Sequence, residues 1–300
     1  MKKAIGIDIG GTKVAAGIIS ESGELLKRAE VKSDASDREK MFASVVEAVE
    51  QLLRDSSFSI ADMAGIGVGV PGKVDRENGI AVFQNNLPWA DFPVKARLQE
   101  QFGLERIMLD NDVYMAAFAE WKTAGGDCEE TFVYMTISTG ISCSIIHNGS
   151  FLRGAGFAGE LGLFPILSNA AGRKLERLEK AAAGPAIEKL AAETLQVGNL
   201  STKDVFDRYF AGVEEYQPII DEVTDNWAQG LYAISCLVDP HKLVFGGSVI
   251  ANNPGLLEIV KEKLKNYQIT EQQHLLDYMS ISTLKQDNGV VGAGLRVFEG

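Results

Sequence analysis

The chain has 300 residues, of which 46% are hydrophobic and 23% are charged, and its formal net charge is −12. This length suits two domains of ordinary size, and the apolar content is ample for buried cores. The acidic balance argues against nucleic acid and anionic membranes as partners, because both attract clustered Lys and Arg. A small anionic substrate stays compatible with this charge, since the local field at a site matters more than the net charge.

The cysteines and the apolar runs indicate a cytoplasmic protein. Cys128, Cys143 and Cys236 are scattered and odd in number, which is typical of reduced residues and not of a disulfide framework. The sequence contains no apolar run of about 18 residues, the length that a membrane helix needs. The first residues lack the apolar core of a signal peptide. We therefore expect a cytoplasmic chain that spans no membrane.

The first third of the chain predicts mixed α/β structure that opens with a hairpin. Short apolar runs flank a pair of glycines, and apolar residues at helical spacing follow further on. The predicted elements are, in chain order, strands over 4–9 and 13–19, a helix over 37–54, a β-rich run over 63–75, a strand over 105–112 and a helix over 112–125.

A strand, a small polar turn and another strand then begin the pattern again. The elements predicted there are two strands around a turn within 131–149, helices over 174–195, 201–211 and 213–236, a strand with a Gly-Gly turn within 241–250 and a helix over 254–266. Since both halves open with a hairpin that turns on Gly, Thr or Ser, we expect two similar domains. We place them at 1–118 and 119–289, with a C-terminal helix at 290–300 that packs on the first.

The glycines of the first hairpin stand in the stretch DIGGTK, residues 8–13. This stretch lacks the spacing of a Walker A loop and of a dinucleotide-binding fingerprint, and a strand follows it where those motifs have a helix. Two interpretations are open. Backbone N–H groups at the turn can form a phosphate nest, with Asp8 facing a Mg²⁺ ion through water. Alternatively, the turn is a plain hairpin and Asp8 is satisfied locally.

An acidic cluster stands where the strand over 105–112 meets the next helix. Asp110, Asn111 and Asp112 occupy this junction. An Asp at such a position is most often a helix cap. In the alternative interpretation, Asp112 is a base that accepts a hydroxyl proton during phosphoryl transfer, because the positive helix end keeps the carboxylate ionised. Asn111 would then orient the substrate hydroxyl.

Three further stretches are weak signals on their own. Thr139 and Gly140 offer a hydroxyl and an open backbone at the second hairpin turn, although such turns are common. Glu160 and Glu179 could bind sugar hydroxyls through paired carboxylate hydrogen bonds, or could be ordinary surface acids. The Gly-Gly turn at 246–247 follows a strand and could hold an adenine or a ribose against bare backbone.

Taken in order along nearly the whole chain, these stretches resemble the motifs of the ROK family of sugar kinases, repressors and related proteins. The motifs are IGIDIGGTKVAAGII, GVGVPGKVD, NNLPW, LDNDVYMAAFAEW, TISTGISCSIIHNGSFLRGAGFAGELG, LEKAAAGPAI, DPHKLVFGGSV and DNGVVGAG. Each motif alone is modest, whereas the whole series in this order is specific to the family.

The resemblance implies an α/β fold of two ribonuclease-H-like domains, of the actin/hexokinase type, with the active site in a cleft between the domains. It also implies an ATP-dependent kinase that uses Mg²⁺ and phosphorylates a hexose, usually at the C6 hydroxyl, with Asp112 as the base. The residues that it places at the sugar are Gly72, Asn86, Asn111, Asp112, Glu160 and Glu179. Those that it places at the nucleotide are Asp8, Gly10, Gly11, Thr12, Lys13, Thr139, Gly140, Gly184, Gly246 and Gly247, with Asp8 also facing Mg²⁺.

One segment departs from the family pattern. Many members have a His after Ala-Gly-Glu-x-Gly and then a cysteine loop that binds zinc, whereas this chain has Leu163, and 161–178 contains neither Cys nor His. Because a structural zinc needs four nitrogen or sulfur ligands, we expect no zinc. How 161–178 is ordered, and what contacts the sugar near C1 and C2, are then open questions.

These features favour a zinc-free, glucokinase-like enzyme whose first expected substrate is glucose or a related aldohexose. N-acetylmannosamine, fructose and a glucoside are the alternative substrates, because Leu163 removes the contact that would best discriminate among them. A sensor that binds sugar without catalysis is the alternative of another class, which the presence of Asp8, Asp112 and Glu160 disfavours. Family habit suggests a homodimer, and the acidic charge favours a kinase over a DNA-binding repressor.

Overall fold

The chain folds into two compact units, which the computed structural model describes at residues 1–84 and 86–299. The first unit comprises Met1–Gly126 together with the residues from Gln286 onward, and the second comprises Asp127–Lys285. The division lies C-terminal to the expected one at 118, because helix α3 (Asp112–Thr123) continues through that position as a single element. The end of the chain returns to the first unit.

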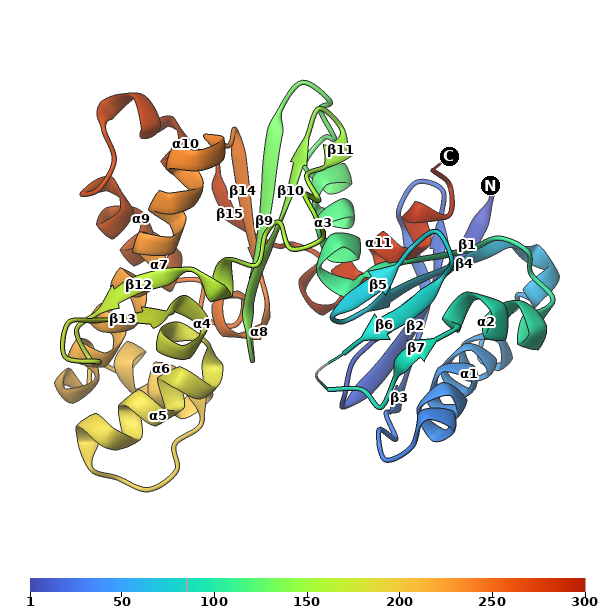
Figure 1. Ribbon diagram of the computed structural model, residues 1–300, viewed down its shortest axis with the longest axis horizontal. Helices are drawn as coiled ribbons and strands as arrows, with labels where there is room; N and C mark the ends of the chain where they lie inside the picture. The colour runs from blue at the N-terminus through green and yellow to red at the C-terminus, as the bar shows by residue number, and fades with distance from the viewer. Residues whose placement is uncertain (85, 300) are drawn as a thin grey trace. The chain divides into compact units, whose positions relative to one another are not determined.

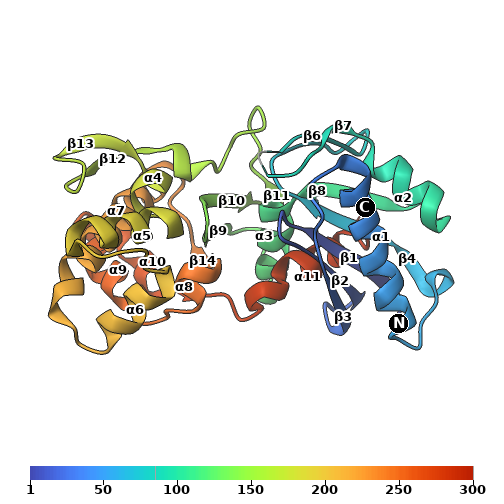
Figure 2. The same cartoon turned by 90° about the horizontal axis from the view of Figure 1, so that it is seen from below.

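A five-stranded sheet forms the centre of the first unit (Figure 1). In the order β3-β2-β1-β4-β8, its strands are β3 (Leu25–Lys32), β2 (Lys13–Ser20), β1 (Lys3–Ile9), β4 (Met63–Val70) and β8 (Ile107–Asn111). Helix α1 (Arg38–Arg54) covers one face, and α3 with α11 (Asn288–Arg296) covers the other, as Figure 2 shows from below. Strands β1, β4 and β8 run parallel, so their carboxyl ends meet at one edge of the sheet.

The alternation of side chains along β1 explains why helices cover both faces. Ile5 and Ile7 are fully buried and belong to the apolar cluster that includes α1. Successive strand residues point to opposite faces, so Gly6 and Asp8 face α11. A Cβ on Gly6 would lie 1.9 Å from the carbonyl oxygen of Val290. The backbone of α11 therefore approaches this strand only because the position is glycine.

A small sheet and a short helix complete the first unit. They are β5 (Lys73–Asp75), β6 (Ile80–Phe83), β7 (Ala90–Phe92) and α2 (Val94–Phe102). Trp89 stacks on Phe92 with ring centroids 4.6 Å apart, and its Nε1 donates to the carbonyl oxygen of Arg38 at 3.0 Å. These contacts anchor the loop 86–89. Asn85, the first residue of the NNLPW motif, lies outside the described residues.

The second unit also has a five-stranded sheet, with a separate two-stranded sheet beside it. In the order β11-β10-β9-β14-β15, the larger sheet consists of β11 (Ser150–Phe151), β10 (Ile141–His147), β9 (Thr131–Ile137), β14 (Lys242–Gly246) and β15 (Met279–Ile281), and the smaller pairs β12 (Pro165–Ser168) with β13 (Lys174–Arg177). The helices are α4 (Leu178–Ala182), α5 (Gly184–Leu195), α6 (Thr202–Phe210), α7 (Gln217–Val238), α8 (Ser248–Ala251), α9 (Leu256–Lys265) and α10 (His274–Asp277). Within residues 1–84 and 86–299, no helix is both long and apolar enough to cross a bilayer.

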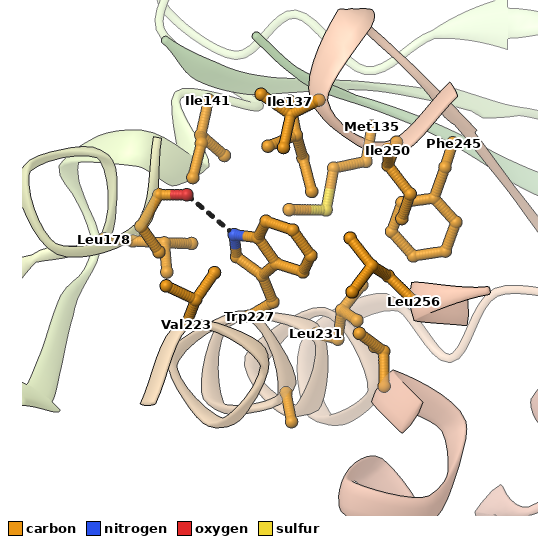
Figure 3. Packing of buried hydrophobic residues seen from close by; sticks show 14 of the residues in the cluster. Met135, Ile137, Ile141, Leu178, Val223, Trp227, Leu231, Phe245, Ile250 and Leu256 are labelled. Carbon is orange, nitrogen blue, oxygen red and sulfur yellow. Dashed lines mark hydrogen bonds between the residues drawn. The ribbon is translucent and has the colours of Figure 1, made fainter. Parts of the chain in front are cut away.

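Trp227 of α7 lies at the centre of the core of the second unit (Figure 3). Its indole is fully buried among apolar side chains that include Met135 and Ile137 of β9. The Nε1 atom donates to the carbonyl oxygen of Ala182 at 2.9 Å, which satisfies the polar atom of the ring. The core contact therefore ties α7 to the end of α4, the helix that carries Glu179.

The expected helix over 174–195 is wrong in its first part. Residues Lys174–Arg177 form strand β13, which pairs antiparallel with β12. The remainder is divided into α4 and α5, because Ala183 is extended, with φ −81° and ψ 168°. Pro185 then stands in the first turn of α5, the position where proline is tolerated in a helix. Apolar spacing alone cannot separate a short strand from the first turn of a helix.

Candidate active site

A tight hairpin turn joins β1 to β2, as the sequence predicts. The Gly10 amide donates to the carbonyl oxygen of Lys13 at 2.9 Å. Ser33, just after β3, holds the turn from outside, because its Oγ donates to the Gly10 carbonyl oxygen at 2.6 Å. Its amide donates to the Thr12 carbonyl oxygen at 3.0 Å. The carbonyl groups of Gly10, Thr12 and Lys13 thus accept hydrogen bonds that hold the turn, and the side chains of Thr12 and Lys13 are exposed.

Asp8 lies on the α11 face of β1, beside the first turn of that helix. A Cβ on Gly289 would lie 2.8 Å from Oδ2 of Asp8, so glycine leaves room for the carboxylate. Burial, and then the charge of Asp112, raise the pKa of Asp8 to about 7. Lys13 and Arg28 act to lower this pKa but do not offset the other effects. Such an environment stabilises either a protonated carboxyl group or a carboxylate with a bound cation.

Asp112 begins α3 at the carboxyl edge of the sheet. The N-cap is Asn111, whose Oδ1 accepts from the Val113 amide at 2.9 Å. Oδ1 of Asp112 lies 3.0 Å from the same amide nitrogen, so the helix N-terminus orients both side chains. Strand β4 lies between β1 and β8, so the end of β1, which carries Asp8, and the end of β8, which leads into Asp112, meet at one edge. The capping role thus falls to Asn111, and Asp112 is the first helical residue.

Gly72 and Asn86 lie near these residues in the same unit. Gly72 has a φ of +80°, and a Cβ there would lie 2.4 Å from the carbonyl oxygen of Phe83. The side-chain amide of Asn111 donates to the Gly72 carbonyl oxygen at 3.0 Å, so two of the expected sugar residues are in contact. Asn86 is exposed, and its carbonyl oxygen would lie 3.0 Å from a Cβ on Gly11. An expected sugar residue therefore borders the expected phosphate turn.

Asp8, with Asp112 near it, fits a magnesium ion by its chemistry. Proteins bind Mg²⁺ through one or two carboxylates, waters and substrate phosphates. The two carboxylates lie near enough for the charge of Asp112 to raise the pKa of Asp8. In the described part of the chain, no cluster of three or more His, Cys, Asp or Glu side chains is arranged to hold a metal ion. A magnesium ion here would thus take its remaining ligands from water and phosphate.

The second hairpin turn, between β9 and β10, is held by Glu179. The Ser138 amide donates to the Gly140 carbonyl oxygen at 2.9 Å, which closes the turn around Thr139. Oε2 of Glu179, in the first turn of α4, accepts from the Ile141 amide at 2.9 Å. A Cβ on Gly140 would lie 2.5 Å from the same oxygen. Glu179, which is expected at the sugar, therefore also fixes the turn at 139–140, which is expected at the phosphates. The spacing of the sequence does not reveal this contact.

Glu160 lies on a loop that is fastened to β10. The Cys143 amide donates to the carbonyl oxygen of Gly159 at 2.7 Å. Gly159 has a φ of +94°, and a Cβ there would lie 2.0 Å from the Cys143 carbonyl oxygen. The Glu160 side chain reaches solvent, yet partial burial and then the charge of Glu179 raise its pKa. The two glutamates thus lie close enough to interact, as two ligands of one sugar would.

The segment 161–178 is ordered as a 3₁₀ turn at Leu161–Leu163, the β12–β13 hairpin and the first residue of α4. Strands β12 and β13 pair along their length, and the Leu178 amide donates to the carbonyl oxygen of Phe164 at 2.9 Å at the base of the hairpin. Leu163 precedes β12 and is 48% exposed. With Phe164 and Glu160 it lines a mostly apolar cavity of about 500 Å³ within the second unit. An apolar surface therefore adjoins Glu160 at this point.

A cavity of about 490 Å³ adjoins the second hairpin turn within the second unit. Two of the expected nucleotide residues, Thr139 and Gly184, line it. The other lining residues, which the sequence does not single out, are Ser138, Pro185, Glu188, Thr202, Lys203, Asp207, Ser248, Val249, Asn252 and Asn253. No motif joins them, because they meet only when α5, α6 and α8 assemble near the turn.

Gly246 and Gly247 stand where β14 leads into α8. A Cβ on Gly246 would lie 2.0 Å from the hydroxyl oxygen of Tyr134. Gly247 has a φ of +85°, and a Cβ there would lie 2.3 Å from the carbonyl oxygen of Ile137. Glycine is thus required at both positions because the turn packs closely on β9. Ser248, the next residue, lines the cavity.

Two α/β units that each open with a hairpin turn define a fold of the actin and hexokinase type. The crystal structure of a ROK hexokinase from Thermus thermophilus confirms this expectation, with a TM-score of 0.82 at 31% identity over 99% of this chain and 100% of that one. A ROK family transcriptional regulator, a homologue of the E. coli MLC protein, has the same fold, with a TM-score of 0.82 at 18% identity over 99% of this chain and 78% of its own.

The chain belongs to the ROK family, whose model matches residues 4–297. Glucokinase of Halalkalibacterium halodurans is 27% identical over 309 aligned residues, which cover 97% of this chain and 93% of that protein. β-Glucoside kinase of Klebsiella pneumoniae is 25% identical, over 97% of this chain and 94% of its own length. The resemblance that the motifs indicate is thereby confirmed over nearly the whole chain.

Proposed function

We propose that this protein is an ATP-dependent hexose kinase whose first substrate is glucose, phosphorylated at the C6 hydroxyl. The observation that carries the proposal is the position of Asp112, which is held at the N-terminus of α3 close enough to Asp8 to raise its pKa. The names of the relatives that match along the whole chain, glucokinase and β-glucoside kinase, support a sugar as the acceptor.

In the proposed reaction, Asp112 accepts the proton of the sugar hydroxyl. The hydroxyl oxygen forms a bond to the γ-phosphorus of ATP, the bond from that phosphorus to the β,γ-bridging oxygen breaks, and ADP leaves. The N-terminus of α3 favours the ionised form of Asp112, so the carboxylate is ready to accept the proton. Positioning matters more here than base strength, because the transition state is loose.

The remaining residues bind and orient the two substrates. Asn86, Asn111, Glu160 and Glu179 would hydrogen-bond to sugar hydroxyls, and Gly72 would offer its backbone. The two hairpin turns, at 10–13 and 139–140, would present backbone and hydroxyl groups to the phosphates, and the cavity that includes Gly184 would hold the nucleoside, with Gly246 and Gly247 shaping the wall near it. A Mg²⁺ ion held by Asp8 would supply positive charge to the phosphates.

The proposed sugar site has an apolar wall beside Glu160. Leu163 and Phe164 present an apolar surface next to Glu160, where a polar side chain would otherwise read a sugar hydroxyl. A site without that contact discriminates weakly between sugars that differ there. N-acetylmannosamine, fructose and a glucoside are therefore the alternative acceptors.

Release of ADP, measured in a coupled assay over a panel of hexoses, tests the proposal. We expect turnover with glucose or one of the alternative sugars, and a loss of about 10³-fold or more in kcat for Asp112→Asn, with sugar affinity nearly unchanged in calorimetry. Asp55→Asn, at an exposed helix end, is the matched control and should keep full activity. Tight sugar binding without ADP release would instead identify a non-catalytic sensor.

We further propose a cytoplasmic, zinc-free homodimer that binds neither nucleic acid nor membranes. The absence of Cys and His from 161–178 supports the lack of zinc, and the net charge of −12 argues against nucleic acid and anionic membranes. The scattered cysteines support the cytoplasm, and the homodimer rests on the habit of the family. Metal analysis of the purified protein tests the zinc content, and light scattering tests the oligomeric state. One zinc ion per chain, or a monomer at working concentration, would contradict it.

A further inference from the structure

The β12–β13 hairpin is fastened to α7 by a glutamine that pairs with its backbone. Oε1 of Gln229 accepts from the Leu167 amide at 2.9 Å, and Nε2 of Gln229 donates to the Leu167 carbonyl oxygen at 3.1 Å. One side chain thus satisfies both backbone polar groups of a single strand residue, as a neighbouring strand would. Only Gln or Asn carries a donor and an acceptor in this arrangement, so a carboxylate of the same size cannot replace it.

Glu222 holds the hairpin near its tip. Its Oε1 accepts from Oγ of Ser168 at 2.9 Å and from the amide of Ala170 at 3.0 Å. Burial acts to raise the pKa of Glu222, but the hydrogen bonds from these two groups help to lower it overall. Glu222 and Gln229 are seven residues apart on α7, so they lie on the same face of the helix. We call these two side chains, with their bonds to the hairpin, the α7 clamp.

The hairpin that the α7 clamp holds joins the two expected sugar glutamates. Before β12, the Leu163 amide donates to the carbonyl oxygen of Glu160 at 3.0 Å, and after β13 the chain enters α4 and reaches Glu179. Gly162, just before the hairpin, packs between β10 and α4. A Cβ there would be 2.3 Å from the Ile141 carbonyl oxygen and 3.1 Å from Cβ of Glu179. A shift of the hairpin would therefore be passed to both glutamates and to the second hairpin turn.

We propose that Gln229 and Glu222 are positioning residues, which keep Glu160 and Glu179 in place for the sugar by clamping the hairpin to α7. Neither residue reaches the substrate in this proposal, which rests on the proposed hexose kinase function. The segment 161–178 contains no Cys or His that could bind a metal. It is held instead by the buried side chains of Leu161, Ile166 and Leu178 and by protein hydrogen bonds. The side-chain amide and carboxylate of the α7 clamp supply some of these bonds.

Substitutions at the two positions test whether the hydrogen bonds to the hairpin matter, and not only the presence of a side chain of similar size. Gln229→Glu has the same shape but cannot donate to the Leu167 carbonyl oxygen, and Gln229→Ala removes both bonds. Glu222→Ala removes the acceptor near the hairpin tip, whereas Glu222→Gln keeps an acceptor oxygen and should behave almost as the unmodified protein does. Gln217→Ala is the control on the same helix, because the Gln217 side chain donates to the exposed carboxylate of Asp221 and not to the hairpin.

We expect Gln229→Glu to accelerate amide hydrogen exchange in 165–177 by about two- to tenfold, the factor to which one net hydrogen bond corresponds. KM for the sugar should rise as well, because the glutamates are held less firmly, while kcat and KM for ATP change much less. Gln229→Ala should show the same split if Gln229→Glu folds poorly. Glu222→Ala should act in the same direction, with Glu222→Gln and Gln217→Ala close to the unmodified protein.

Two results would overturn the proposal. Unchanged exchange in 165–177 would show that the α7 clamp does not hold the hairpin. Faster exchange with an unchanged KM for the sugar would show that the hairpin does not position the glutamates. If the unmodified protein phosphorylates no sugar, it is the proposed function that fails. Sugar binding, measured by calorimetry in the same variants, then decides whether the α7 clamp positions the glutamates.

Discussion

Replacement of Asp8 by asparagine should change how the stability of the first unit depends on pH. The pKa of Asp8 is raised to about 7 in the folded chain, from an ordinary value of 3.8, by burial and by the charge of Asp112. Between these two values the folded chain holds a proton on Asp8 that the unfolded chain has lost. The contribution of Asp8 to the unfolding free energy must therefore fall as the pH rises through this interval and level off above it.

The size of this effect follows from the two pKa values. One pKa unit corresponds to about 1.4 kcal/mol, so the rise from pH 5 to pH 7 should remove roughly 2 to 3 kcal/mol of stability through Asp8 alone. The side-chain amide in Asp8→Asn cannot ionise, and every other titrating group is common to both proteins. The advantage of Asp8→Asn over the unmodified protein should therefore grow by that amount between pH 5 and pH 7 and stay constant above about pH 8.

Urea unfolding followed by tryptophan fluorescence can read this difference in the first unit. In a Trp227→Phe background the remaining tryptophans, Trp89 and Trp121, both belong to the first unit and report its unfolding. The titration is run without Mg²⁺, at intervals from pH 5 to pH 8, and Asp55→Asn serves as the control. Parallel curves for Asp8→Asn and the unmodified protein across this range would refute the reasoning.

Three other substitutions test the packing and the nucleotide cavity. Gly292→Ala would place a Cβ 1.7 Å from the carbonyl oxygen of Met115 and should cost about 1 to 3 kcal/mol or more, which urea unfolding measures; an unchanged midpoint would show that α11 can move away. Trp227→Ala should cost about 3 to 5 kcal/mol in the same assay, and a cost below about 1 kcal/mol would contradict the buried packing in Figure 3. Thr202→Val removes a hydroxyl that donates to Glu188 at 2.9 Å in the cavity beside Thr139, and it should raise KM for ATP several-fold without changing KM for the sugar. A rise in KM for the sugar alone would show that the nucleotide binds elsewhere.

Local patterns in the sequence predict the first unit and the turn residues well. Short apolar runs on both sides of the Gly-Gly pair indicate a hairpin, whereas a Walker A loop or a dinucleotide-binding fingerprint would be followed by a helix. The structure has the hairpin, formed by β1 and β2. The junction of Asn111 and Asp112 also lies at the expected helix N-terminus. These features depend on neighbouring residues, so a sequence pattern can carry them.

The contacts between distant segments could not be predicted in this way. Nothing in the sequence pairs Glu179 with the Ile141 amide or Gln229 with Leu167, because each bond joins elements that are brought together only by the core around Trp227. The β12–β13 hairpin could not be predicted either, because its strands are too short to show an alternation of apolar and polar residues. The cavity beside Thr139 likewise draws on three helices that no motif connects.

The return of the chain end to the first unit sets an order on its synthesis. Strands β1, β2 and β4 leave the ribosome early, but α11, which packs on all three, emerges only after the whole second unit. The Asp8 environment, with Gly289 against its carboxylate, is therefore completed last. The second unit can fold as soon as its own residues have emerged, whereas a chain that stalls or is cut before α11 would leave part of this sheet face uncovered and Asp8 less buried.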